Sequence, residues 1–166
     1  MLETVLTITS MQTEEEARAF KTLNEEWIAL LFAIEEEDRV ILNNPVKYIV
    51  NKGGDVLIAR DGDSIVGCVA LVPTGAGVFE LSKMSVTPKF RGRGYGRRII
   101  HAAINRARGL GATSLFLGSS TKLPNAVHLY ESVGFKHVPV EQVGPMPYVR
   151  ADVFMELELK RIQRQN

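Results

Sequence analysis

The chain has 166 residues, of which 45% are hydrophobic and 23% are charged, a composition typical of one soluble globular domain. This composition excludes a disordered chain, and no run of about 18 apolar residues predicts a transmembrane helix. The net charge of +1 hides an asymmetry, because the N-terminal part carries "TEEEAR" and "EEEDR" whereas six arginines and no acid occupy residues 91–108.

The N-terminal segment predicts a strand followed by helices. Residues 4–10, "TVLTITS", alternate and are β-branched, which indicates a strand. Thr13 followed by Glu16 is a capping box, and apolar residues then recur at helical spacing up to about Phe32. A second helix is expected over roughly residues 36–42, and Pro45 predicts a new helical start.

The middle of the chain predicts a meander of three antiparallel strands. Residues 55–60 and 65–73 are apolar runs joined at Asp61–Gly62, a strong signal for a hairpin. The turn "TGAG" then leads into residues 78–86, "VFELSKMSV", as the third strand.

The C-terminal half alternates helices and strands. A helix follows the arginine- and glycine-rich stretch, and it ends near Gly109 and Gly111. Residues 113–119 predict a strand, residues 124–132 a helix that stops at Gly134, residues 135–140 a strand and residues 141–148 a loop. The last strand spans residues 151–160 and directs four side chains inward: Val153, Met155, Leu157 and Leu159.

This order of elements predicts the fold class. Antiparallel runs combined with strand–helix–strand crossovers indicate an α/β (α+β) fold, with a mixed, mostly antiparallel central sheet of about six or seven strands and helices on both faces. No repeat or linker divides the chain, so residues 1–166 are expected to form a single domain.

Cysteine and histidine usage argues against metal chemistry. The single cysteine, Cys68, excludes a disulfide within the chain, and its apolar setting "IVGCVALV" predicts a buried, inert thiol. The histidines lack the spacing of metal ligands and are expected at the surface: His101, His128 and His137. Because the first ten residues carry Glu3 and no basic leader, a cytoplasmic location is expected.

The stretch "SVTPKFRGRGYGRR" is the strongest functional signal. Gly92, Gly94 and Gly96 alternate with arginines directly before a helix, and such glycines allow backbone N–H groups to converge on an anion at the helix start. A phosphate or pyrophosphate is the natural ligand, although the spacing matches neither a nucleoside-triphosphate loop nor a dinucleotide fingerprint. An RNA-binding tract and a plain structural turn are the alternatives.

The pattern Arg-x-x-Gly-x-Gly, formed by Arg91, Gly94 and Gly96, resembles the pyrophosphate-binding motif of the GNAT superfamily of N-acetyltransferases. "ELSKMSVTPKFRGRGYGRRIIHAAINRARGLG" and "AVHLYESVGF" extend the resemblance, and the expected element order follows the superfamily's fold across almost the whole chain. The resemblance implies that acetyl-CoA is the cosubstrate. It implies coenzyme contacts at Met84, Ser85, Val86, Arg91, Gly92, Arg93, Gly94, Tyr95, Gly96, Arg97 and Asn125.

One position departs from the superfamily's pattern. Its members commonly carry an asparagine seven residues before a tyrosine of the second motif, where it contacts the pantetheine arm. That tyrosine is Tyr130 here, and the corresponding position is Leu123, with Asn125 two residues out of register. A polar pantetheine contact is therefore weakly supported, whereas the expected fold is unaffected.

Two side chains are candidates for catalysis. Glu80 interrupts an apolar alternation and shares one face of its strand with Ser82, Met84 and Val86. The resemblance implies that this face meets the substrate and that an acid here takes the proton of an attacking amine, directly or through water, or orients the acceptor. The resemblance places Tyr130 as the proton donor to the leaving thiolate, and it implies a strand bulge whose N–H groups near residues 84–86 bind the acetyl carbonyl. The alternatives are an exposed glutamate and a core tyrosine.

The acceptor is the least determined part of the hypothesis. Glu35, Glu36, Glu37 and Asp38 either attract a cationic amine or form a solvated charged run. Tyr148 and Arg150 could bind a carboxylate of the substrate or lie at the rim without a role.

The expected function is transfer of the acetyl group of acetyl-CoA to a primary amine of a small molecule or peptide, by direct attack in a ternary complex. The alternative on the same fold is a non-catalytic acyl-CoA sensor. No nucleic-acid or membrane partner is expected, and a homodimer stays open.

Overall fold

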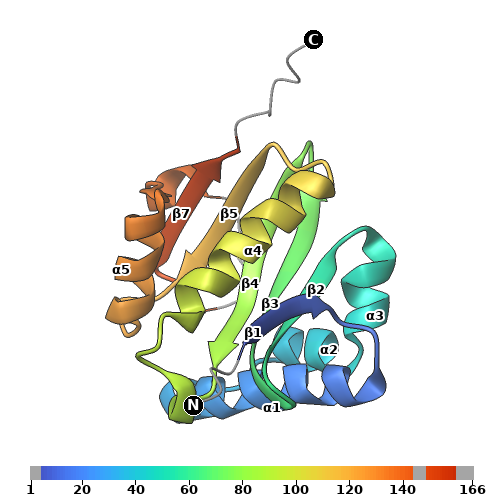
Figure 1. The fold of residues 1–166 in the computed structure, drawn as a ribbon. Coiled ribbons are helices and arrows are strands. Elements are labelled where there is room, and N and C mark those ends of the chain that lie inside the picture. The colour runs from blue at the N-terminus through green and yellow to red at the C-terminus, as the bar shows by residue number, and fades with distance from the viewer. Residues whose placement is uncertain (1–4, 144–148, 160–166) are drawn as a thin grey trace.

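The computed structural model describes residues 5–143 and 149–159, and its centre is a seven-stranded sheet in the order β1-β2-β3-β4-β5-β7-β6 (Figure 1). The strands are β1 (Leu6–Ser10), β2 (Asp55–Asp61), β3 (Ser64–Gly75), β4 (Val78–Val86), β5 (Ser114–Ser119), β6 (Lys136–His137) and β7 (Val153–Glu158). The helices are α1 (Glu14–Leu31), α2 (Glu36–Asn43), α3 (Pro45–Tyr48), α4 (Tyr95–Gly109) and α5 (Pro124–Val133).

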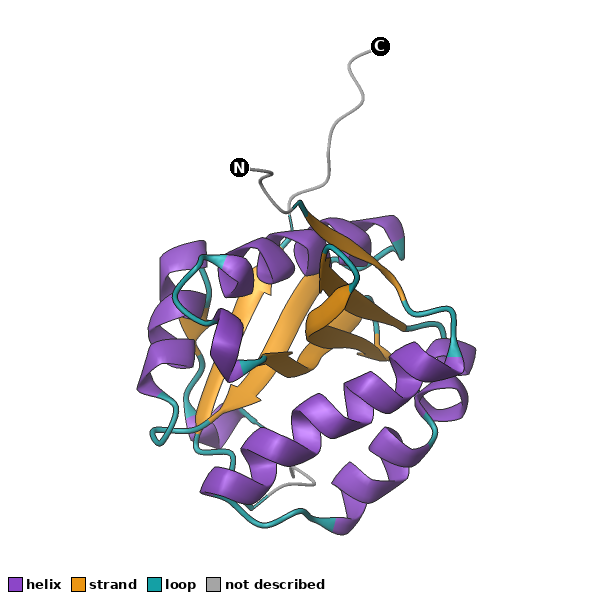
Figure 2. Ribbon diagram, turned by 60° about the horizontal axis from the view of Figure 1, so that its bottom comes forward, coloured by secondary structure: helices purple, strands orange, loops and turns teal. Residues whose placement is uncertain are grey.

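Neighbouring strands are antiparallel except β4 and β5, which are parallel. Helices α1 and α2 pack on one face of the sheet and α4 and α5 on the other, as the two views together show (Figures 1 and 2). The α1/α2 face buries a core that includes Phe20, Leu42 and Cys68, whereas the α4/α5 face buries a core around Ile100 and Met155. The mixed sheet with helices on both faces confirms the predicted fold class.

Local signals in the sequence set several boundaries of the helices. The Thr13 side chain accepts a hydrogen bond from the Glu16 N–H, and the Glu16 carboxylate accepts one in return from the Thr13 N–H, so the predicted capping box begins α1. Gly134, with φ of +116°, ends α5 in the left-handed conformation that glycine adopts without strain.

Strand β4 carries a bulge. Between the pairs Cys68↔Ser85 and Ala70↔Ser82, β4 has one residue more than β3, and Lys83 has a φ of +53° there. A bulge is what the family resemblance implied for this strand.

The bulge corrects one prediction about β4. We expected Glu80, Ser82, Met84 and Val86 on one face, but one extra residue reverses the alternation of side chains. Met84 and Val86 pack with the core on the α4/α5 face, whereas the Ser85 hydroxyl donates to the Leu23 carbonyl of α1 on the opposite face.

The C-terminal strands are shorter than predicted. Strand β6 stops at His137 because Pro139 has no N–H to continue the ladder and instead precedes a single 3₁₀ turn at Val140–Gln142. Strand β7 begins at Val153 rather than at residue 151. Residue 160 and Tyr148 lie outside the described residues.

The predicted state of the cysteine is confirmed. Cys68 is fully buried on β3, and burial raises the pKa of its thiol to about 12, so the thiolate is scarce at neutral pH. The three histidines are exposed, as expected. Within the described residues, no helix combines the length and apolarity needed to cross a membrane.

Candidate active site

A cleft opens where β4 and β5 separate. The two strands pair only at Val78↔Ser114, Phe79↔Leu115 and Glu80↔Phe116, and beyond Glu80 the backbone of β4 has no ladder partner on β5. A cavity of about 620 Å³ lies at this gap, and its walls come from α1, β4, the loop before α4, β5 and α5. Because these elements lie on both faces of the sheet, the cleft is lined from both faces.

The glycine-rich loop forms one end of the cleft. Gly92 and Gly94 have φ values of +79° and +78°, and Gly94 directly precedes α4. No atom lies within 4 Å of a Cβ added at either residue, so these glycines are required by the backbone conformation and leave open space beside it. Gly96 has a different role, because an added Cβ would come within 3.1 Å of Leu129 Cδ2 on α5.

Side chains of this loop are held by neighbours. The Arg91 Nε donates to the Val86 carbonyl at 3.0 Å, and the Arg93 guanidinium lies 4.8 Å from the Phe90 ring centre. The Tyr95 hydroxyl donates to the Asp61 carboxylate, which raises the pKa of Tyr95 and ties the loop to the end of β2.

Ten of the eleven predicted coenzyme-binding residues line the cleft, and Arg93 does not. Among the ten, Asn125 is an exposed residue in the first turn of α5. Leu123, at the position where the superfamily commonly carries asparagine, also lines the cleft. The side chain of Arg97 donates to Ser132 Oγ at 2.9 Å.

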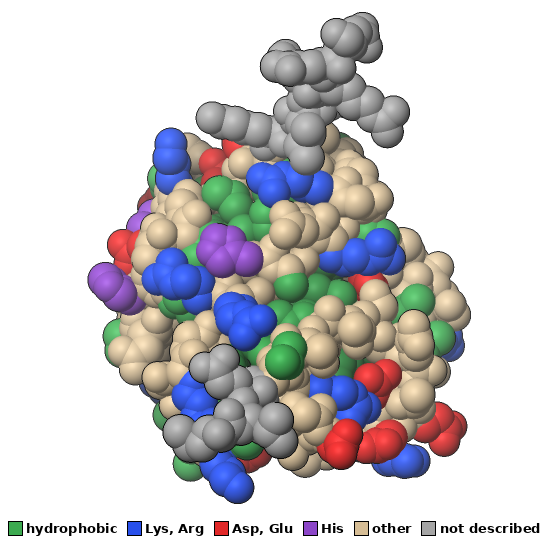
Figure 3. Space-filling model, in the orientation of Figure 1, with side chains coloured by type: hydrophobic (Ala, Val, Ile, Leu, Met, Phe, Trp, Pro, Cys, Tyr) green, Lys and Arg blue, Asp and Glu red, His purple; other side chains and the backbone are tan. Residues whose placement is uncertain are grey.

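Figure 3 shows basic side chains spread over the face that carries α4, while acidic side chains gather near α1. The first turn of α1 is acidic, with Glu14, Glu15 and Glu16. The start of α4 has no acid, so its positive helix end and nearby arginines favour an anion at this end of the cleft.

Glu80 lies in the cleft wall at the point where β4 and β5 part. It is half-buried rather than placed on an open sheet face, and burial raises the pKa of its carboxyl. The Lys83 ammonium opposes this increase, while Glu37 adds to it. The Glu80 carboxylate is therefore a stronger base than an ordinary glutamate.

Tyr130 also lines the cleft, from the opposite side of the gap on α5. Its side chain is 92% buried, its ring contacts Phe135 with 5.8 Å between ring centres, and burial raises the pKa of its hydroxyl to about 12. The ring thus packs in the core while the residue also borders the cavity. Tyr130 is therefore a core tyrosine that lies at the candidate site.

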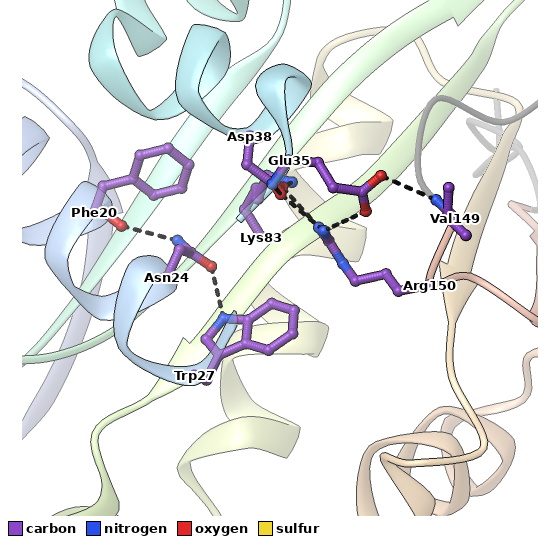
Figure 4. A network of polar contacts seen from close by, with 8 residues as sticks. All are labelled: Phe20, Asn24, Trp27, Glu35, Asp38, Lys83, Val149 and Arg150. Carbon is purple, nitrogen blue, oxygen red and sulfur yellow. Dashed lines mark hydrogen bonds and ion pairs between the residues drawn. The ribbon is translucent and has the colours of Figure 1, made fainter. Parts of the chain in front are cut away.

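A buried network of charges at the cleft wall was not predicted (Figure 4). The Lys83 Nζ lies 2.7 Å from Asp38 Oδ1, and the Arg150 guanidinium donates to both Asp38 oxygens at 2.7 and 2.8 Å and to Glu35 at 3.1 Å. Asp38 is fully buried. Burial alone would raise the pKa of Asp38, but hydrogen bonds from Arg150 and Lys83 outweigh it and lower the pKa to about 2.

This network corrects two interpretations of the sequence. Asp38 is neither solvated nor open to a cationic substrate, because two cations of the chain itself hold it. The carboxylate partners of Arg150 are Asp38 and Glu35 rather than a substrate. The signal that could have revealed the network is Lys83, a charged residue at a position of β4 where the alternation predicts burial.

Among the described residues, no three histidine, cysteine, aspartate or glutamate side chains come together as a metal site would require.

Comparison with known proteins identifies the family. The model of the acetyltransferase (GNAT) domain matches residues 52–137. An uncharacterized N-acetyltransferase of Schizosaccharomyces pombe is 30% identical over 163 residues, which cover 94% of this chain and 96% of that protein.

Two solved structures share the fold at lower identity. An acetyltransferase of the GNAT family from Staphylococcus aureus has a TM-score of 0.84 and 19% identity over 94% of this chain and all of that chain. The protein yncA of Salmonella typhimurium, solved with its cofactor acetyl-CoA, has a TM-score of 0.72 and 22% identity over 97% of this chain and 98% of that chain. Together with the family model and the yeast relative, these matches show that the chain belongs to the GNAT family of acetyltransferases.

Proposed function

We propose that the chain is a single-domain N-acetyltransferase that moves the acetyl group of acetyl-CoA to a primary amine of a small molecule or peptide, by direct attack in a ternary complex. The observation that carries this proposal is the cleft between β4 and β5, which brings the glycine-rich loop, the bulged strand, Glu80 and Tyr130 to one cavity.

The residues at the start of α4 fit the diphosphate of acetyl-CoA. Gly92 and Gly94 leave open space beside the backbone, and the N-terminus of a 15-residue helix directs N–H groups toward an anion. Arg91 and Arg97 add positive charge at the cleft. When bound, acetyl-CoA supplies an acetyl group activated as a thioester.

The backbone of β4 supports the acetyl carbonyl in this proposal. Because the ladder to β5 ends at Glu80, an N–H group within residues 84–86 that points to this edge can donate to the carbonyl oxygen. The bulge at Lys83 bends β4, so the backbone of residues 84–86 runs in a different direction from that of a regular strand. Donors fixed by a strand need no reorganisation as negative charge develops on the oxygen.

Glu80 removes the proton that prevents attack. A primary ammonium with a pKa of about 10 must become neutral before its nitrogen can attack the thioester carbonyl. The Glu80 carboxylate accepts this proton, directly or through water, before the nitrogen attacks. As the carbon–nitrogen bond forms and the carbon–sulfur bond breaks, the nitrogen loses a second proton to water, and Tyr130 passes its own proton to the sulfur and is reprotonated from water. The raised pKa of Glu80 increases its affinity for the proton.

Tyr130 serves the leaving thiolate. A sulfur in water with a thiol pKa of about 8.5 is too weak a base to deprotonate a tyrosine whose pKa is about 12. Removal from water disfavours a thiolate as it disfavours a tyrosinate, so shielding the sulfur in the cleft brings the two pKa values closer together. In a desolvated cleft, the Tyr130 hydroxyl can therefore donate its hydrogen bond and proton to the sulfur.

We expect Tyr130→Phe to lower kcat by about 100-fold, at the low end of the contribution of a general acid, while the KM for acetyl-CoA changes little. Thiol release from acetyl-CoA in the presence of an amine measures both constants. Tyr48→Phe, on α3 outside the cleft, is the matched control. An equal loss in the two variants would argue against proton donation by Tyr130.

We expect Gly94→Ala to weaken acetyl-CoA binding, because an alanine in the left-handed region costs about 1–2 kcal/mol and the loop relaxes away from that conformation. Gly62→Ala is the control, since Gly62 also has a positive φ, of +59°, and no atom within 4 Å of its added Cβ, but lies in the β2–β3 turn. Calorimetric titration with acetyl-CoA should show a higher Kd for Gly94→Ala alone. The same Kd for both variants would contradict the assignment of the loop.

Thiol release measured with acetyl-CoA and a broad panel of amines and peptides tests the proposed function directly. An amine that raises the rate well above buffer, with acetylated product identified by mass spectrometry, supports an enzyme. Tight binding of acetyl-CoA without transfer to any acceptor would instead support an acyl-CoA sensor.

A further inference from the structure

We propose that the natural acceptor carries a single amino group on an apolar aromatic or branched aliphatic body, and that the end of α1 forms its binding surface. This inference rests on the proposed acetyl transfer and names the class of its acceptor. Three features of the cleft support it: the apolar residues on the α1 side, the distribution of charges, and the contacts of the aromatic rings.

The cleft is apolar on the side of α1. Four neighbouring residues at the end of this helix line it: Trp27, Leu30, Leu31 and Phe32. Leu30 is 79% exposed and Leu31 is 41% exposed, so the helix presents hydrocarbon to solvent at the rim of the cavity. Because α1 lies on the face opposite α4 and its glycine-rich loop, this surface is available to an acceptor when the α4/α5 side holds the donor.

The charges of the cleft suit one ammonium group. Of the described residues that line the cavity, Glu80 is the only acid. The cations that line it are more numerous: Lys83, Arg91, Arg97, Lys122 and Arg150. A second ammonium on the acceptor would lose hydration without gaining a carboxylate.

Two acids on the α1 side are engaged by the chain itself, and a third, Glu37, is exposed and does not line the cavity. Asp38 is fully buried and holds both Lys83 and Arg150, and Glu35 holds Arg150 and accepts from the Val149 N–H at 3.2 Å. These two carboxylates therefore do not supply an extra anionic subsite. Glu80 pairs with one ammonium, and the rest of the acceptor meets hydrocarbon.

The aromatic rings at the cleft carry cations of the chain itself. The Arg150 guanidinium lies 5.9 Å from the Trp27 ring centre, and the Lys122 Nζ lies 5.3 Å from the Phe32 ring centre. These contacts compete with any additional cation for the ring faces. The leucines and the remaining ring edges form an apolar surface. Binding is favoured when the hydrocarbon part of an acceptor covers this surface and removes it from water.

The test compares two groups of amines with purified protein and saturating acetyl-CoA. Phenethylamine and 3-methylbutylamine represent apolar monoamines, and putrescine and spermidine represent polycations. We expect kcat/KM to be at least about tenfold higher for the apolar monoamines than for the polycations. A single methylene group in an apolar pocket already changes kcat/KM by about tenfold or more. Equal or better turnover of the polycations would overturn the inference.

A binding measurement separates this inference from the proposed function. Calorimetric titration of the four amines into the protein with CoA present ranks their affinities without any acetyl transfer. If no amine is acetylated, the proposed function fails, and the order of affinities still decides the inference. Tighter binding of spermidine than of phenethylamine would contradict it.

The double variant Leu30→Gln/Leu31→Gln locates the surface. We expect the KM for phenethylamine to rise by about fivefold or more, through loss of apolar contact, while the KM for acetyl-CoA stays unchanged. Val46→Gln is the control, because Val46 is a helical residue that is 47% exposed and lies outside the cleft lining. An unchanged KM for phenethylamine, or a changed oligomeric state in place of a changed KM, would overturn the assignment.

Discussion

Replacement of Glu80 with glutamine is expected to lower kcat/KM for the acceptor amine by about 100- to 1000-fold, which is the usual contribution of a general base. Glutamine has the shape of glutamate but cannot accept the proton of the ammonium. The affinity for acetyl-CoA should not change, because we assign its diphosphate to the glycine-rich loop at the start of α4, and Glu80 is not part of that loop.

The pH dependence of the rate identifies the group. Glu80 must be ionised to act as a base, so activity should fall as the pH decreases through its pKa, which burial raises above the ordinary value of 4.5. In Glu80→Gln the limb at the pKa of Glu80 should disappear, and the rate should instead rise with the neutral fraction of the amine up to the amine's own pKa of about 10. Glu156→Gln, an exposed glutamate on β7, is the matched control.

Stability distinguishes a catalytic from a structural role for Glu80. Because the folded-state pKa is raised, the ionised carboxylate makes folding less favourable at neutral pH. Glu80→Gln should therefore unfold at the same temperature as the wild-type protein or at a higher one. The expected loss in rate is at least about 100-fold. A rate for Glu80→Gln within about threefold of the wild-type rate would show that Glu80 is not the base.

Replacement of Asp38 with asparagine is expected to lower the free energy of unfolding by about 3–5 kcal/mol, as in other buried ion pairs that lose one partner. The substitution keeps the shape of the side chain but removes the carboxylate that pairs with Lys83 and one of the two described carboxylates that pair with Arg150. For a chain of this length, the melting temperature should fall by about 10 °C. Glu36→Gln, at an exposed position of the same helix, should change it little.

The effect of Asp38 should depend on pH. Its folded-state pKa is about 2 and its ordinary value is 3.8, so its contribution to stability is present above pH 3.8 and is lost as the pH falls toward 2. This difference corresponds to about 2 kcal/mol, and part of it is offset because burial lowers the pKa of Lys83 despite its contact with Asp38.

Denaturant unfolding at pH 7 and at pH 3 measures this dependence. The gap between the wild-type protein and Asp38→Asn should be smaller at the lower pH. Equal unfolding midpoints for Asp38→Asn and Glu36→Gln at pH 7 would show that the buried network does not stabilise the fold.

The sequence predicted the fold class and most elements because their signals are local. Apolar runs defined β2 and β3, the Asp61–Gly62 turn joined them, and the capping box defined the start of α1. The candidate coenzyme loop was also readable, since its glycines and arginines lie within a few residues of one another. Patterns of this kind need no knowledge of distant partners.

The charge network was not readable because its members are far apart in the chain. Asp38 meets Lys83 across 45 residues and Arg150 across 112 residues. Its neighbours Glu36 and Glu37 are exposed, so a local pattern predicted a solvated run. Cys68 was assigned correctly because its own neighbours are apolar, which makes burial a local property.

The bulge in β4 places an additional charged side chain on the face of the sheet that α1 and α2 cover. Deletion of Lys83 would pair Val69 with Met84 and make the ladder to β3 regular, while residues 84–86 would keep the sheet faces that they now occupy. The strand would lose the ammonium group that pairs with Asp38 and the backbone turn that accompanies the positive φ of Lys83. The extra residue therefore joins the backbone of the cleft wall to the buried ion pair, so a one-residue deletion would change both together.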